Sequence, residues 1–440
     1  MSSNISLSAV DIFVLVIYGV LIFLGHRWVR KRYDSKDLLP YYYSGWLFKV
    51  LFAFLFALVY LFFLGGGDIN AYWDGASCLA DLFYSNPEAY FSELWETKRN
   101  LGIAYHFNGT TGFPPGWIWR EEEAWNSTKI ISLLAIITNK GFWTVTLILS
   151  TFAFWVSWLL AVQLNAKESM HRNTLLSALF FVPSVCFWCS GISKDSLLYT
   201  LALLLIYQFF SLLKWKNSFS IRRALLAAIL LWFIYSLRHY LAYALAVPLI
   251  LAWMSRYGSR FTGRPVLLWL FRLVLFTGLV FSFSFIINSN QTRELIAEAN
   301  VTKSDFSQNP IYSGAKYDMP FTTGSPGEIL ALFPLAVFTA LLRPSILDPV
   351  GASYLLNQLE SLLLLWLIFR FLFLGNSLLR LRRILSHEFL LYSLIFVLIV
   401  AFMAGYSSIL YGVLVRIRSI ALPFFILLLL HRPSAIASTE

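Results

Sequence analysis

The feature that most constrains this chain is a succession of apolar runs, each long enough to cross a bilayer. A membrane-spanning helix needs about 20 mostly apolar residues. Runs of this kind occur at 8–26, 41–64, 139–164, 174–190, 196–213, 224–237, 239–254, 266–287, 355–374, 388–406 and 413–430. We therefore expect an all-α, polytopic integral membrane protein with about eleven transmembrane helices, forming a single transmembrane domain over residues 1–440.

Composition supports this expectation and excludes a soluble enzyme. The chain is 58% hydrophobic and only 13% charged, whereas soluble domains are about 45–50% apolar and about 25% charged. Its net charge of +11 does not indicate a nucleic-acid partner, because Lys and Arg gather on the cytoplasmic loops of membrane proteins. The partner that composition predicts is the lipid bilayer.

The basic segments predict how the chain is oriented. Lys and Arg concentrate in 26–36, 213–223, 255–264 and 378–383. If these segments are cytoplasmic, the N-terminus lies outside and the C-terminus lies in the cytoplasm. The short apolar segment 328–342 then fits only as a re-entrant or interfacial helix. Two long segments fall on the outer, periplasmic side: a first large loop, 65–138, and a second, 288–327.

Ionisable residues at the ends of membrane spans are functional candidates, because burying them near lipid is unfavourable. On the predicted topology the candidates lie on the outer side, and they are Asp68, Asp74, Lys194, Asp195, Arg238, His239, Arg343, Arg416 and Arg418. Each has a simpler explanation: Asp can cap a helix, and Arg can extend its side chain to lipid phosphate. We expect Glu121–Glu123, with Lys98 and Arg99, to form a solvated face.

One chemistry would use cations and acids at this depth. Arg binds phosphate through two parallel hydrogen bonds, so arginines at headgroup level suit a lipid phosphate or pyrophosphate. A sugar acceptor loses a proton as it attacks, which requires a nearby carboxylate base. Asp68 stands at the start of the first outer loop, and Tyr72 could stack on a sugar ring.

These residues resemble a known class. An acid in the first large outer loop resembles the GT-C class of polyprenyl-phosphate-sugar glycosyltransferases. The stretches 183–196, 341–361 and 411–424 are similar to bacterial polysaccharide-repeat polymerases, which build O-antigen or exopolysaccharide.

The resemblance implies a GT-C-like fold in the bacterial cytoplasmic (inner) membrane. It also implies transfer of sugar from a polyprenyl-(pyro)phosphate-linked donor to a glycan acceptor. On this resemblance Asp68 is the candidate base. Asp74 is a further candidate catalytic acid, because it also lies near the start of the first outer loop. Arg343, Arg416 and Arg418 are the candidate binders of phosphate or glycan.

Two other functions remain alternatives. One is a transporter or flippase of a lipid-linked or anionic solute, which should carry charges near the bilayer midplane. The other is an exosortase-like transpeptidase using Cys189 and Arg416. Charges gathered on one side favour the enzyme. The three cysteines form no metal-binding pattern, so we expect no metal-ligating residues, and a divalent cation remains an open cofactor.

Overall fold

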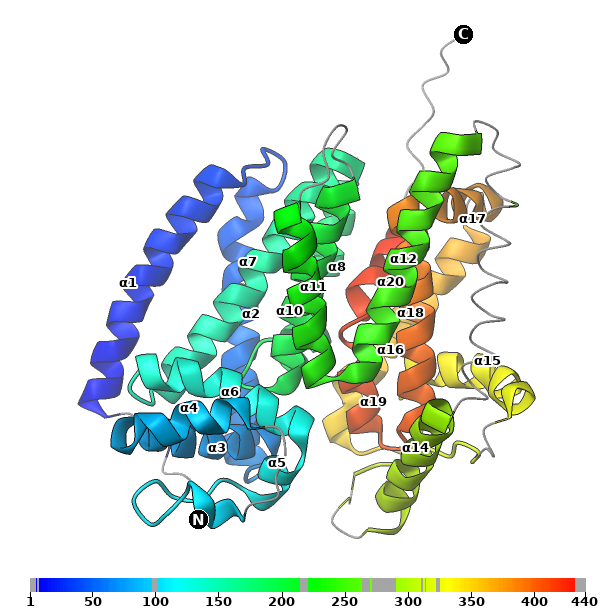
Figure 1. Cartoon of the computed structure of the whole chain (residues 1–440). Helices are drawn as coiled ribbons and strands as arrows, with labels where there is room; N and C mark the ends of the chain where they lie inside the picture. The colour runs from blue at the N-terminus through cyan, green and yellow to red at the C-terminus, as the bar shows by residue number, and fades with distance from the viewer. Residues whose placement is uncertain are drawn as a thin grey trace. The chain divides into compact units, whose positions relative to one another are not determined.

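The computed structural model describes residues 8–96, 102–168, 170–213, 221–262, 290–309, 314–321, 325–374 and 376–431, with residues 5, 270 and 312 (Figure 1). Within these ranges the regular elements are helices, and the β-bridge Lys316–Leu410 is isolated. The expected span 266–287 falls outside the described residues except for residue 270. The described chain forms two compact units, residues 1–209 with 219–242, and residues 210–218 with 243–440.

Six helical segments in the described residues are long and apolar enough to cross a membrane. They are α1 (Ala9–Arg32), α2 (Tyr42–Leu58) with its flanking turns, α7 (Phe142–Glu168), α10 (Lys194–Leu213), α16 (Leu355–Phe373) and α18 (Glu388–Ser407). A seventh candidate is the pair α19 (Tyr411–Arg418) and α20 (Leu422–Leu430), which bends by 62°. The protein is therefore an α-helical, multi-pass membrane protein, and the count of eleven spans stays a prediction.

The apolar faces of these helices explain why the chain needs lipid. Phe13 and Val16 on α1, and Leu47 and Leu51 on α2, are exposed. Contiguous exposed apolar surface of this kind is typical of a membrane-facing helix. Basic residues occupy the last turn of α1, where they complement the negative end of the helix dipole.

The first unit is a bundle with a helical layer across one end (Figure 1). Its bundle contains α1, α2, α7, α8 (Arg172–Leu179), α9 (Pro183–Trp188), α10 and α11 (Ile221–Leu237). The layer contains α3 (Asp68–Ser85), α4 (Pro87–Trp95), α5 (Gly116–Arg120) and α6 (Glu122–Ile137). Most of the expected first loop is thus helical. The expected span 174–190 is two short helices, because the chain breaks before Pro183.

Glycines set how this layer joins the bundle. Gly65, Gly66 and Gly67 all have positive φ, which only glycine adopts readily. They turn the chain from the end of α2 into α3, whose first residue is Asp68. A Cβ at Gly75 would lie 2.8 Å from Thr128 Cγ2, so α3 can pack closely against α6 only with glycine at this position.

The second unit contains the remaining described helices. These are α12 (His239–Thr262, whose first turn belongs to the first unit), α14 (Asn290–Gln308), α15 (Pro326–Leu342), α16, α17 (Ser377–Ser386), α18, α19 and α20. The backbone N–H of Tyr317 donates to the Ile409 carbonyl at 2.8 Å, and that of Tyr411 donates to Ala315 at 3.1 Å. These bonds fix part of the expected second loop onto the break between α18 and α19.

Candidate functional site

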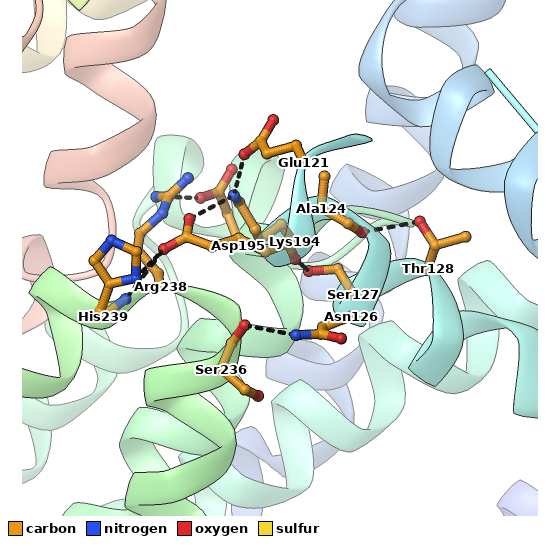
Figure 2. A network of polar contacts seen from close by, with 11 residues as sticks. Glu121, Ala124, Asn126, Ser127, Thr128, Lys194, Asp195, Ser236, Arg238 and His239 are labelled. Carbon is orange, nitrogen blue, oxygen red and sulfur yellow. Dashed lines mark hydrogen bonds and ion pairs between the residues drawn. The ribbon is translucent and has the colours of Figure 1, made fainter. Parts of the chain in front are cut away.

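Six ionisable residues of the first unit form a charged cluster: Glu121, Glu123, Lys194, Asp195, Arg238 and His239. Figure 2 labels Glu121, Lys194, Asp195, Arg238 and His239. They come from three places in the chain. Glu121 and Glu123 lie at the start of α6, and Lys194 and Asp195 begin α10. Arg238 separates α11 from α12, and His239 begins α12. The structure thus brings together the four residues that the sequence predicts at 194–195 and 238–239.

Lys194 carries two carboxylate partners. Its Nζ lies 3.2 Å from Glu121 Oε1 and 3.1 Å from Glu123 Oε2. The Lys194 side chain is 6% exposed, whereas that of Glu121 is 51% exposed. The ammonium group is therefore held in place within the protein, and one of its two partners reaches into solvent.

Glu123 is also bound by His239. The His239 Nδ1 lies 2.9 Å from Glu123 Oε1, and the His239 backbone N–H donates to the same oxygen at 3.2 Å. Burial raises the pKa of Glu123, but the hydrogen bond from His239 and the charges of Lys194 and Arg238 outweigh burial and lower the pKa to about 2. Glu123 is therefore a carboxylate at neutral pH.

Asp195 and Arg238 form the second half of the cluster. Arg238 Nη1 donates to Asp195 Oδ1 at 3.0 Å, and the Asp195 side chain is 1% exposed. Asp195 lies in the first turn of α10, where the helix dipole favours a negative charge. Nearby, Asn126 Nδ2 donates to the Ser236 carbonyl at 3.2 Å and so joins α6 to the last turn of α11 (Figure 2).

The predicted catalytic acids lie on α3. Asp68 is its first residue and is half-buried, and Asp74 is also half-buried. Tyr72 is buried, and its ring centroid lies 6.4 Å from that of Trp117 on α5. The roles of Asp68 and Asp74 as base, and of Tyr72 in binding sugar, stay predictions.

A second ionic group lies in the second unit, around Asp348. This carboxylate pairs with Arg343 and accepts hydrogen bonds from the Tyr411 hydroxyl at 2.8 Å and the Ser345 hydroxyl at 2.9 Å. Burial raises the pKa of Asp348, but the hydrogen bonds from Arg343, Ser345 and Tyr411 outweigh it and hold the pKa well below its usual range. The Arg343 guanidinium lies 5.4 Å from the Tyr411 ring centroid and 5.8 Å from that of Tyr317.

The two other predicted arginines differ in environment. Arg418 is fully buried, pairs with Glu360 at 3.0 Å, and donates to the carbonyls of Ala340 at 3.2 Å and Arg343 at 2.8 Å. It therefore caps the C-terminal end of α15, which satisfies carbonyls that the helix itself leaves unpaired. Arg416, on the same helix, is half-buried.

Three residues of interest were missed by sequence reasoning. Glu121 and Glu123 were expected on a solvated face, but both pair with Lys194 in the charged cluster, and for Glu123, whose side chain is 19% exposed, the expectation is wrong. Lys98 and Arg99, expected on that face, lie outside the described residues.

Lys49 lies near the middle of the span Leu39–Phe63 and is fully buried, with its Nζ 4.5 Å from the Tyr199 ring centroid. The sequence signal that could have identified this buried ionisable group is a single Lys within an apolar run.

Comparison with known proteins gives no relative: no family model, curated protein or solved structure matches this chain.

Among the residues that the structure describes, no three His, Cys, Asp or Glu side chains group closely enough to hold a metal ion. A divalent cation therefore stays a prediction without a named site.

Proposed function

We propose that this protein is an integral-membrane glycosyltransferase or polysaccharide polymerase. It would transfer sugar from a polyprenyl-(pyro)phosphate-linked donor to a glycan acceptor at the outer face of a bacterial cytoplasmic membrane. The observation that carries the proposal is the charged cluster, in which Lys194 and Arg238 are held beside three carboxylates at the start of a candidate membrane span.

The donor's phosphate groups match the cations of this cluster. A lipid-linked phosphate has its chain in the bilayer and its charge at headgroup level, which is also the depth expected of the first residues of α10. Lys194 and Arg238 are held in position by ion pairs within the protein. The same cations would stabilise the negative charge that develops on the leaving phosphate.

The acceptor requires a base, and Asp68 is the residue that we propose. It follows three glycines of positive φ and begins the layer that lies across the end of the bundle. The acceptor hydroxyl would attack the anomeric carbon and give its proton to the Asp68 carboxylate. The bond between that carbon and the phosphate oxygen would break, and the lipid phosphate would leave with the electron pair.

Lys49 favours a second candidate function, a transporter or flippase for a lipid-linked or anionic solute. Its amino group is buried among α2 and α10 rather than at the end of a span. Ionisable groups at this depth mark solute pathways in many membrane proteins. The enzyme remains the better supported function, because the cluster places acids and cations together.

Reconstitution separates these functions. The purified chain in liposomes would receive a synthetic polyprenyl-pyrophosphate-linked radiolabelled sugar and a glycan acceptor. An enzyme yields a labelled glycan and free lipid pyrophosphate, and Asp68→Asn slows this reaction by about 10²–10⁴-fold. Movement of intact donor between leaflets, with no labelled glycan, would instead establish the transporter.

A further inference from the structure

We propose that Glu121 and a phosphate ester compete for the ammonium group of Lys194, so that the ligand binds by displacing Glu121. This inference rests on the proposed function, because it names how the donor's phosphate enters the charged cluster. It assigns Glu121 a role in selecting the ligand, which is distinct from the proposed role of Asp68 as base.

The ammonium group of Lys194 already binds two anions. An ammonium group has three N–H donors, and here two separate carboxylates lie within 3.2 Å of it. An oxygen of a phosphate ester could accept the hydrogen bond that Lys194 now donates to Glu121. The Lys194 side chain is 6% exposed, so it cannot reach an anion elsewhere without giving up its present position.

The two carboxylates are not held equally. Glu123 also accepts hydrogen bonds from the ring and the backbone of His239, whereas the Glu121 side chain is 51% exposed. Once released, the Glu121 carboxylate can be solvated by water, because half of its side chain is already exposed. Glu121 is therefore the partner that an incoming anion can replace, while Glu123 keeps Lys194 in place.

Charge balance supports the same exchange. The carboxylates Glu121, Glu123 and Asp195 lie beside the cations Lys194 and Arg238. A phosphate ester that entered beside all three carboxylates would be repelled by them. Departure of Glu121 removes one negative charge from the site and leaves an N–H of Lys194 directed at the ligand.

The test uses the full chain in phosphatidylcholine nanodiscs and measures binding of two probes, inorganic pyrophosphate and a polyprenyl monophosphate. We expect Glu121→Gln to bind both probes about twofold to fivefold more tightly, because a half-exposed carboxylate is removed as a competitor for the ammonium group. Glu122→Gln is the matched control, since Glu122 is the exposed neighbour and its loss changes the net charge equally. Lys194→Met should abolish the binding of both probes.

Tighter binding by Glu121→Gln but not by Glu122→Gln supports the displacement of Glu121 by phosphate. If only the affinity for the lipid probe increases, the site binds lipid phosphate and not the free anion. Equal affinities in wild type, Glu121→Gln and Glu122→Gln, with binding lost in Lys194→Met, overturn the exchange and leave the proposed function standing. Absence of binding by wild type and by Glu121→Gln overturns both. Phosphatidylglycerol nanodiscs that compete equally well would show that the site recognises any anionic lipid, which also contradicts the proposal.

Discussion

The guanidinium of Arg238 donates to the carboxylate of Asp195 at 3.0 Å, and the Asp195 side chain is 1% exposed. This pair joins the first turn of α10 to the residue that separates α11 from α12. A buried carboxylate that loses its cation is left uncompensated. The pair therefore holds the ends of three helices together at the point where the proposed donor phosphate binds.

A double-mutant cycle would measure this coupling. Arg238→Met should destabilise the protein by about 3–5 kcal/mol, because it leaves Asp195 buried and unpaired. Asp195→Asn in addition should restore part of that loss, since the stranded charge is removed. The measurement is thermal unfolding in detergent of wild type, both single variants and the double variant. Strictly additive effects would show that the two residues act independently.

The pH dependence of the free energy of unfolding should show the contribution of the ionised Glu123 carboxylate. Its pKa is lowered from 4.5 to about 2 in the folded protein, so the unfolded chain binds more protons between these values. The stabilisation from Glu123 is therefore complete above about pH 4.5 and is lost as the pH falls toward 2. Its size is on the order of 3 kcal/mol.

Glu123→Gln tests this directly. The variant should be less stable than wild type at pH 7, and the difference should shrink as the pH falls from about 4.5 toward 2. Thermal unfolding of both proteins across this range makes the comparison, with Glu122→Gln as the control for charge. A constant difference at every pH would mean that Glu123 does not titrate as described.

The positions of the helices could be predicted from the sequence, because apolar runs alone decide where a chain can cross lipid. The run 388–406 corresponds to α18 at Glu388–Ser407, and 355–374 corresponds to α16 at Leu355–Phe373. The helical layer of α3 to α6 was not predicted. Its sequence is less apolar than a span, and its amphipathic pattern becomes informative only once the bundle end that it covers is known.

The charged cluster could be predicted only in part. Lys194, Asp195, Arg238 and His239 were recognisable because they interrupt apolar runs. Glu123 was not, because its partners Lys194 and His239 lie 71 and 116 residues further along the chain. Three consecutive acids look solvated in sequence, and only tertiary packing shows that Glu121 and Glu123 face a cation.

Labelling can test whether α15 crosses the membrane. Phe321 and Leu347 flank α15 and are 60% and 93% exposed. If α15 is re-entrant or interfacial, Phe321→Cys and Leu347→Cys, each in a Cys78→Ser background, should both react with an impermeant maleimide added outside intact cells. Reaction at only one of the two positions would show that α15 spans the membrane.

The arginines of the second unit should affect donor affinity. We expect Arg343→Ala and Arg416→Ala to weaken binding of a polyprenyl monophosphate about tenfold or more, as loss of a charge-assisted contact does. Arg343→Lys keeps the charge without bidentate geometry and should show an intermediate loss. Arg382→Ala, at an exposed position of α17, is the control. Unchanged affinity in a folded Arg343→Ala, Arg416→Ala double variant would contradict the prediction that these two arginines bind phosphate.

The decisive prediction concerns Asp68. Asn keeps the size of Asp and caps a helix about as well, but it cannot accept a proton. Asp68→Asn should therefore slow sugar transfer by about 10²–10⁴-fold, while expression, thermal stability and binding of the lipid donor stay close to wild type. The measurement is transfer of radiolabelled sugar by the purified variant in liposomes, with Asp74→Asn alongside. If Asp68→Asn is active and Asp68→Ala is only less stable, Asp68 is a helix cap and Asp74 becomes the candidate base. If both Asn variants turn over normally, the base is neither of these acids, and the outer-loop mechanism is wrong.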